Sequence, residues 1–395
     1  MDNYNLVSFD DTSAAFSSRT DRELKKMNFL FTIMAMGKLT KIGSYFVKNA
    51  LKWKLPVAKV IKNTLFKHFC GGENLDECKN TVDKLSLFNI KTILDYAVEA
   101  ESSMASYDHT MEVLRKSIDL AASDKKNIPF VVFKMTALCR FSILEKAQSG
   151  VELSFIEKEE FDHFNQMVEK IAAYAAEAGV RLMVDAEESW IQDTIDAVTI
   201  KLMHQFNQHN AIVYRTFQMY RVDMPFLLKE AVQSAKENGY ILGVKLVRGA
   251  YMEKERKRAL ELGYPSPIFP TKEETDQAYN EGLEFCLNHL QYLSIVSGSH
   301  NEESNLLQTK LMASLKIKND DERIYFAQLY GMGDHISYNL AGKQYNVGKY
   351  VPFGPLTAVM PYLLRRAEEN KSINGQTGRE LSLIRKELNR RKSKP

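Results

Sequence analysis

The chain has 395 residues, of which 45% are apolar and 26% are charged, and its mass is 45.2 kDa. This composition is typical of a soluble globular protein and excludes wholesale disorder and a collagen-like fold. The net charge of +3 says little about partners, and four cysteines without CxxC or zinc-binding spacing indicate a reducing compartment.

The chain begins with a polar segment and continues into a helical one. Residues 1–20 are rich in Ser, Thr and Asp, so we expect them to be poorly ordered. Residues 21–87 are predicted to be helical, because apolar side chains such as Leu24, Met27 and Phe31 recur at helical spacing.

The helical region is rich in lysine. Residues 24–72 contain ten Lys and no Asp or Glu, and such a basic patch can meet phosphates, anionic lipid heads or water. The apolar run at 29–36 has eight residues, whereas about 20 are needed to span a bilayer. The acidic residues that precede it do not fit a transit peptide. We therefore expect a cytoplasmic protein, and peripheral attachment to the inner face of an anionic membrane remains open.

From residue 88 onward, short apolar and β-branched runs alternate with helical stretches. Eight such runs occur, at residues 91–97, 130–135, 180–185, 211–216, 242–248, 292–297, 324–329 and 346–351. Apolar strands that alternate with helices indicate a parallel sheet buried on both faces. Eight units predict an α/β fold, a (β/α)8 TIM-type barrel over residues 88–371, followed by a basic C-terminal tail at 372–395. A doubly wound open sheet is the alternative, although no GxGxxG motif follows any of the runs.

Polar side chains interrupt or end several of the predicted strands, where a barrel carries its chemistry. Lys134 lies at the end of the second strand, and a buried ammonium there must either pair with Asp185 or another barrel carboxylate or bind an anion. The acidic run 185–188 ends the third strand and can hold a metal, act as a base or cap the next helix. The other histidines and carboxylates lack the spacing of a metal site, so we expect no metal.

The segment 243–251 places two cations on one predicted strand. Period two puts Lys245 on one face and Arg248 on the other, so one should face the barrel interior and the other the helix layer. Gly249 and Ala250 leave room for a flat group to approach the backbone.

A predicted helix near the C-terminal end of the barrel carries Arg365 and Arg366. Adjacent arginines on a helix project about 100° apart, so the pair can grip a carboxylate from two directions, and Glu369 can brace either of them. A solvated helix face is the alternative.

Four motifs follow one another in this sequence. They are Lys245-Leu-Val-Arg-Gly-Ala-Tyr251, His300-Asn301, Gln328-Leu-Tyr-Gly-Met-Gly333 and Tyr362-Leu-Leu-Arg-Arg-Ala-Glu-Glu-Asn370. Together they resemble the FAD-dependent proline dehydrogenase family, in its stand-alone form, over about residues 88–371. The resemblance implies a distorted (β/α)8 barrel with FAD at its C-terminal mouth. It also implies oxidation of L-proline to Δ1-pyrroline-5-carboxylate, with hydride passing to FAD N5 and electrons then to a membrane quinone.

The resemblance also implies roles for individual residues. Arg365 and Arg366 would hold the proline carboxylate, with Lys134 beside it. Asp185 would belong to the same site, and Tyr350, Leu329 and Tyr251 would wall the pyrrolidine ring. The residues implied for FAD are Gln218, Lys245, Val247, Gly249, Ala250, Thr271, Lys272, Ser299, His300 and Glu369. Lys245 and Met252 stand where some members carry Arg and an aromatic residue.

Two other classes of function remain open. One is a phosphate-binding barrel aldolase or isomerase, in which Lys134 would form a Schiff base. The other is a non-catalytic protein that binds lipid or nucleic acid through the lysine-rich segment. The resemblance favours proline, a membrane quinone and an anionic membrane surface as partners, and no nucleic acid.

Overall fold

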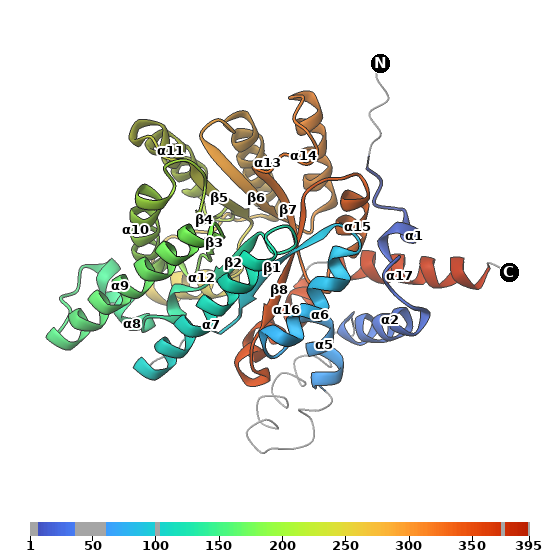
Figure 1. Cartoon of the computed structure of the whole chain (residues 1–395), viewed down its shortest axis with the longest axis horizontal. Helices are drawn as coiled ribbons and strands as arrows, with labels where there is room; N and C mark the ends of the chain where they lie inside the picture. The colour runs from blue at the N-terminus through green and yellow to red at the C-terminus, as the bar shows by residue number, and fades with distance from the viewer. Residues whose placement is uncertain (1–6, 36–60, 99–102, 373–375, 394–395) are drawn as a thin grey trace.

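The computed structural model describes residues 7–35, 61–98, 103–372 and 376–393. Eight parallel strands close into a barrel in the order of the sequence, and β1 pairs with β8. The strands are Ile90–Tyr96 (β1), Phe130–Phe133 (β2), Arg181–Val184 (β3), Val213–Gln218 (β4), Leu242–Val247 (β5), Leu293–Gly298 (β6), Ile324–Leu329 (β7) and Val347–Phe353 (β8). All eight fall within two residues of the predicted starts, so the barrel is confirmed and the open sheet is wrong (Figure 1).

Helices surround the barrel and connect successive strands (Figure 1). They are Leu75–Ser86 (α6), Met104–Ser123 (α7), Phe141–Ser149 (α8), Phe155–Ala178 (α9), Ser189–Phe206 (α10), Met224–Asn238 (α11), Met252–Leu262 (α12), Lys272–Asn288 (α13), Glu302–Ser314 (α14), Asp334–Gly342 (α15) and Leu356–Ser372 (α16), with a 3₁₀ turn at Met135–Ala137 (η2). Local signals set their ends. Ser154 and Glu157 form a capping box at the start of α9, and Gly179 ends that helix in the left-handed conformation.

The strands are apolar on both faces because each face is covered. Inside the barrel, Phe130 packs edge to face with both Tyr214 and Tyr325, in a cluster that includes Val132 and Met183. Outward-facing residues of the same strands pack against the helices in one larger core. The barrel interior is therefore filled with side chains near its bottom, and polar groups gather at the other end.

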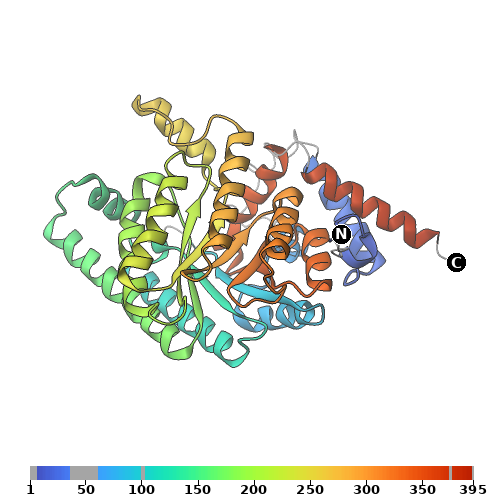
Figure 2. The ribbon, with the colours of Figure 1, turned by 90° about the horizontal axis from the view of Figure 1, so that it is seen from above.

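Two segments outside the barrel pack against each other. Thr12–Ala15 (α1) and Asp21–Ala35 (α2) lie beside Gln376–Lys392 (α17), as both ribbon views show (Figures 1 and 2). Lys62–Phe66 (η1, a π-helical turn) and Lys67–Phe69 (α5) complete the described N-terminal part. Leu24, Met27 and Phe31 of α2 are buried in a cluster with apolar residues of α17, which confirms the helical spacing predicted there.

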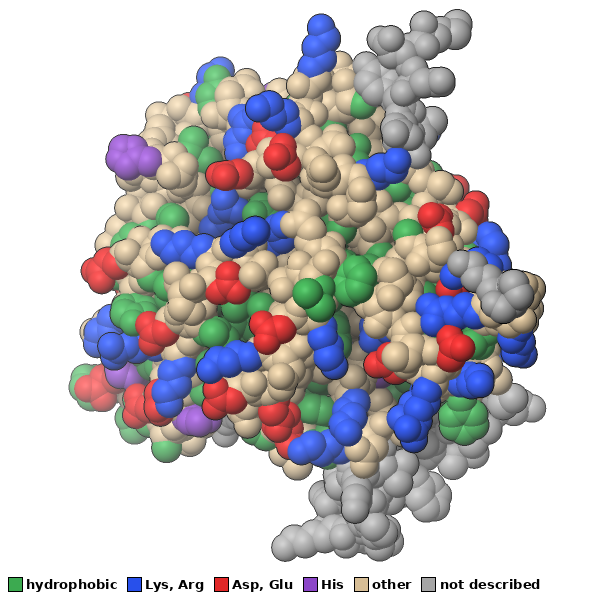
Figure 3. All heavy atoms as spheres, turned by 45° about the vertical axis from the view of Figure 1, so that its right-hand side comes forward, with side chains coloured by type: hydrophobic (Ala, Val, Ile, Leu, Met, Phe, Trp, Pro, Cys, Tyr) green, Lys and Arg blue, Asp and Glu red, His purple; other side chains and the backbone are tan. Residues whose placement is uncertain are grey.

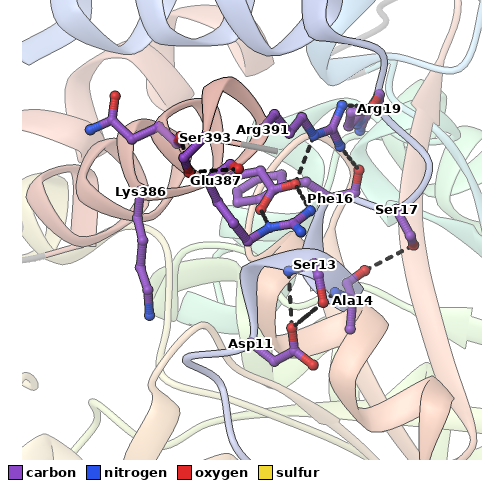
Figure 4. Close-up of polar contacts among 12 residues, drawn as sticks. Asp11, Ser13, Ala14, Phe16, Ser17, Arg19, Lys386, Glu387, Arg391 and Ser393 are labelled. Atoms are coloured by element: carbon purple, nitrogen blue, oxygen red, sulfur yellow. Dashed lines mark hydrogen bonds and ion pairs between the residues drawn. The ribbon is translucent and has the colours of Figure 1, made fainter. Parts of the chain in front are cut away.

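The expectation that residues 1–20 are poorly ordered is wrong for residues 7–20, the part of that segment that the structure describes. Phe9 and Phe16 are only 3% exposed and α1 is formed, so residues 7–20 are ordered. The basic C-terminal residues form α17, in which Glu387 accepts hydrogen bonds from Arg390 and Arg391. Arg391 also donates to the carbonyl of Phe16 at 2.9 Å, so α17 holds the N-terminal segment (Figure 4). Shared apolar burial and these ion pairs give order to both ends of the chain.

The lysine-rich segment is described only in part, since residues 36–60 lie outside the described residues. Within the described residues, no helix is long and apolar enough to cross a membrane. On the face shown in Figure 3, Lys and Arg side chains are interspersed with Asp and Glu.

Candidate active site

The carboxyl ends of four strands bring two lysines, an aspartate and a tyrosine together. Lys134 Nζ lies 2.9 Å from one Asp185 oxygen, and Lys245 Nζ forms a very short ion pair with the other. The Tyr350 hydroxyl donates to Asp185 at 2.7 Å, while Lys245 Nζ lies 4.4 Å from the centre of the Tyr350 ring. All four residues are at most 9% exposed. Residues from β2, β3, β5 and β8 therefore converge on one carboxylate.

The charges in this cluster compensate one another. Burial alone would raise the pKa of Asp185, but the ammonium groups of Lys134 and Lys245 outweigh it and hold this pKa well below its usual value. Burial and the nearby Asp185 carboxylate raise the pKa of Tyr350, so its phenol stays neutral and donates its proton. The paired ammonium of Lys134 is poorly suited to Schiff-base chemistry, which needs a neutral amine.

The two cations of β5 lie on opposite faces, as predicted. Lys245 points into the barrel, whereas Arg248 points to the helix layer and rim. Arg248 pairs with Asp276 of α13 at 2.6 Å and donates to Ser299 at 2.9 Å. Its guanidinium also lies 4.3 Å from the centre of the Tyr279 ring.

The end of β5 leaves backbone exposed at the mouth of the barrel. Val247 is half-buried, and Gly249 and Ala250 are exposed. Gly249 has φ +138°, and a Cβ at this position would lie 2.5 Å from the ring of Tyr220. Only glycine fits there, and the chain can pass close to a flat group at this rim.

His300 offers an unpaired donor in the same region. Its Nε2 accepts the backbone N–H of Leu329 at 3.2 Å, which places the ring proton on Nδ1. Burial, followed by the charges of Lys349 and Arg366, lowers the pKa of His300 to about 3, so the ring is neutral. Nδ1 has no hydrogen-bond partner among the described residues. An unpaired buried donor just after β6 fits a cofactor rich in acceptor atoms, as FAD is.

The remaining residues predicted to bind FAD have structural partners. Gln218 donates to the carbonyl of Glu187 at 2.8 Å, and Thr271 caps α13 with Glu274. Lys272 pairs with Asp276, and Asp276 also pairs with Arg248, which donates to Ser299. Lys272 therefore belongs to the network on the outer side of β5 and not to the Asp185 cluster. The side chain of Glu369 lies outside the described residues.

Helix α16 places its arginines near the mouth. Arg366 is 7% exposed, and its guanidinium lies 5.0 Å from the centre of the Tyr362 ring. Arg365 is half-buried. Leu329 packs against the apolar cluster of α16 and also against the barrel residues that include Tyr350. The structure therefore brings the arginine helix and the Asp185 cluster to opposite sides of Leu329.

Tyr251 lies at the N-terminal end of α12, 6% exposed, with the Lys254 ammonium 5.2 Å from the centre of its ring. Its backbone carbonyl accepts a hydrogen bond from the backbone N–H of Glu255 in that helix, at 2.9 Å. The residue therefore lies beyond the end of β5, on the same rim as Gly249.

Two buried residues near the site belong to sequence features named above but were not assigned to the site individually. Glu187 is 3% exposed, and both its carboxylate oxygens accept hydrogen bonds from Thr136. Burial raises its pKa to about 7. Tyr362 is 7% exposed on the same helix as Arg366, and its helical spacing of four residues from Arg366 is the signal that could have found it. The acidic run 185–188 holds no metal cluster within the described part of the chain.

The closed barrel and the charged cluster at the carboxyl ends of its strands define a (β/α)8-barrel enzyme. The proline dehydrogenase family model matches residues 78–379. The chain therefore belongs to the proline dehydrogenase family, whose members are oxidoreductases that oxidise proline.

Relatives and a solved structure agree with this assignment. Proline dehydrogenase 1, mitochondrial, of Dictyostelium discoideum is 33% identical and covers 96% of this chain and 74% of its own length. Hydroxyproline dehydrogenase of Xenopus laevis is also 33% identical, covering 84% of this chain and 78% of its own. Proline utilization A of Bdellovibrio bacteriovorus, inactivated by N-propargylglycine, superposes with a TM-score of 0.73 at 22% identity. That match covers 92% of this chain but 38% of the larger protein, and it supports the fold alone.

Proposed function

We propose that this chain oxidises L-proline to Δ1-pyrroline-5-carboxylate with FAD, and that a membrane quinone takes up the electrons. The observation that carries the proposal is the convergence of Lys134, Asp185, Lys245 and Tyr350 at the mouth of the barrel. FAD, when bound, supplies a two-electron acceptor that takes the hydride at N5.

The substrate would bind between the arginine helix and the Asp185 cluster. Arg365 and Arg366 would hold the carboxylate of proline, with Lys134 beside it, because charge-assisted bonds from a guanidinium fork fix a carboxylate in one orientation. Leu329 and Tyr350 would wall the apolar ring, with Tyr251 at the rim. Fixing the ring in this way is the main contribution of the protein to hydride transfer.

The amine of proline must lose a proton before hydride leaves the adjacent carbon. Asp185 is a poor base for this step, because it accepts from three donors and its pKa is held well below the usual value. This supports water as the proton acceptor. The role of Asp185 would then be to hold Lys134, Lys245 and Tyr350 in place.

Binding of FAD would use the rim of β4, β5 and β6. Gln218, Lys245 and the exposed backbone at Gly249 and Ala250 would approach the flavin ring. Val247 lies on the same strand. Ser299 and His300 would contact it from β6, and Thr271 and Lys272 lie where they could reach the remainder of the cofactor.

The direct test is anaerobic addition of L-proline to the purified protein. We expect a yellow protein whose flavin absorbance bleaches as Δ1-pyrroline-5-carboxylate forms. A flavin-containing protein that stays oxidised with proline would contradict the proposal. A colourless protein in which borohydride traps a substrate on Lys134 would favour the aldolase class instead.

Tyr350 should set the preference between proline and hydroxyproline. Its ring would crowd the substrate carbon that bears the hydroxyl in trans-4-hydroxyproline, so Tyr350→Ser should narrow the preference for proline about tenfold in kcat/KM. Tyr350→Phe is the matched control, because it keeps the ring and removes only the hydroxyl, which donates to Asp185 and accepts from Lys245. Equal oxidation of the two substrates by the wild type would show that this wall is misassigned.

Electron transfer to a bilayer quinone requires contact with the membrane, and the lysine-rich segment is the proposed contact. Each cation near an anionic surface contributes about 1 kcal/mol, and aromatic side chains at the interface add to this. Arg390 and Arg391 are ion-paired with Glu387, so they are less suited to this role. We expect flotation with anionic liposomes at low salt and loss of flotation at high salt. Binding that does not depend on lipid charge or salt concentration, or a lack of binding, would contradict electrostatic docking of this segment on the membrane.

A further inference from the structure

The loop between β7 and α15, residues 330–333, is held by groups from both ends of the chain. Glu380 of α17 accepts the backbone N–H of Gly333 at 2.5 Å. Asp334, which follows the loop, pairs with Arg19 from the N-terminal segment at 2.9 Å and with Lys349 of β8 at 2.9 Å. Lys349 also donates to the carbonyl of Met332 at 2.5 Å.

The buried charges beside this loop draw part of their compensation from the N-terminal segment. The Lys349 side chain is 1% exposed and Asp334 is 6% exposed, so an unpaired charge at either position would be costly. Burial lowers the pKa of Lys349, and the Asp334 carboxylate acts in the opposite direction. Burial would raise the pKa of Asp334, but Lys349 and Arg19 together hold it well below its usual value. Arg19 therefore supplies part of the compensation from outside the barrel.

The other side of the same loop carries the substrate site. Leu329, directly before the loop, pairs in register with Tyr350, and its backbone N–H donates to His300. Met332 packs in the apolar cluster of α16, the helix of the arginine pair, together with Tyr362. Strand β8 connects the loop contacts to the substrate site, because its side chains alternate between the two faces. Lys349 donates to the loop, while the next residue, Tyr350, faces the barrel interior.

The loop has little room to move independently. Gly331 has φ +80°, and a Cβ there would lie 2.2 Å from the backbone carbonyl of His68. Gly333 has φ +62°, and a Cβ there would lie 2.9 Å from Nδ1 of His300. A displacement at Gly333 would therefore be passed to His300 and Leu329.

We propose that Glu380 and Arg19 are positioning residues for proline oxidation, and that they act through the β7–α15 loop on Leu329 and the arginine helix. Both lie outside residues 78–379, which the family model matches. The proposal rests on the proposed function, because it takes Leu329, Arg365 and Arg366 as substrate contacts.

The test compares two side chains of α17 in the flavin-loaded enzyme. Glu380→Ala removes the acceptor of the Gly333 amide, whereas Arg385→Ala removes a contact of the same helix with Asn28 of α2 at 3.3 Å, which touches neither the loop nor Arg19. We expect Glu380→Ala to lower kcat/KM for L-proline about tenfold or more, because small misplacements of binding groups are costly in rate. Arg385→Ala should leave kcat/KM of the folded enzyme unchanged.

Conservative variants separate positioning from folding. Glu380→Gln keeps an oxygen acceptor for the Gly333 amide, so it should retain most of the wild-type kcat/KM. Arg19→Lys keeps the positive charge, so it should retain a higher kcat/KM than Arg19→Ala. Unchanged kcat/KM in folded Glu380→Ala, or equal losses in Glu380→Ala and Arg385→Ala, would overturn the inference. Failure of the proposed function has a different result, since the wild-type flavin would then not be bleached by proline.

Discussion

Replacing either arginine of α16 by alanine should raise the KM for L-proline steeply while FAD stays bound. Truncating one partner of a desolvated charge pair costs about 2–4 kcal/mol, which corresponds to roughly a 30- to 700-fold rise in KM. Arg366→Ala should have the larger effect, because Arg366 is 7% exposed and stacks on Tyr362, whereas Arg365 is only half-buried. The measurement is steady-state kinetics together with the flavin content of each variant.

A cation elsewhere at the mouth provides the control for this result. Arg258 of α12 pairs with Glu145 at 2.6 Å and lies 4.5 Å from the centre of the Trp190 ring, so Arg258→Ala removes a comparable group without touching α16. Its KM for proline should stay close to that of the wild type. Glu369→Gln should act more weakly than either alanine variant, by loosening the bracing of the pair. An unchanged KM in both Arg365→Ala and Arg366→Ala would refute their assignment to the substrate carboxylate.

The strands could be predicted because their signal is local. A run such as 242–248 is mostly apolar on both faces, which predicts a buried strand. The alternation of side chains along a strand is enough to place Lys245 and Arg248 on opposite faces. The ion pair of Lys134 with Asp185 is one of the alternatives that the strand ends offer, and the structure confirms it. The meeting of Lys245 and Tyr350 with Asp185 could not be predicted from local signals, since they come from positions 60 and 165 residues away along the chain. Only the resemblance to a known family indicates that all four residues share one site.

The ends of the chain show why local composition does not predict whether a segment is ordered. Residues 1–20 are polar on average, yet two phenylalanines in this stretch are buried against partners hundreds of residues away. The ion pair of Arg19 with Asp334 spans 315 positions, and nothing in the sequence near either residue indicates the other. Thr271 has the opposite character, because its capping box with Glu274 is a local signal for the start of a helix.

Asp185→Asn should both destabilise the barrel and abolish most proline oxidation. The variant leaves two buried ammonium groups facing a neutral amide, and an uncompensated buried charge costs about 3–5 kcal/mol of the free energy of unfolding. Because the same carboxylate orients Lys134, Lys245 and Tyr350, we expect kcat to fall by roughly 100-fold or more in the folded variant. Urea unfolding and single-turnover bleaching of the flavin measure the two effects separately.

The pH dependence of the stability lost in Asp185→Asn shows whether Asp185 stabilises the barrel through its charge or only through its packing. Its pKa in the folded state lies below the unfolded value of about 3.8, so its stabilisation is fully present above that pH and is lost as the pH falls through the folded pKa. The difference between wild type and Asp185→Asn should therefore be constant from about pH 5 to pH 8 and shrink below about pH 4. Asp196→Asn is the matched control, since Asp196 is 7% exposed and pairs with Arg215 at 2.6 Å in the helix layer. That variant should lose stability and keep its kcat, and if Asp185→Asn does the same, the Asp185 cluster serves the fold and not the reaction.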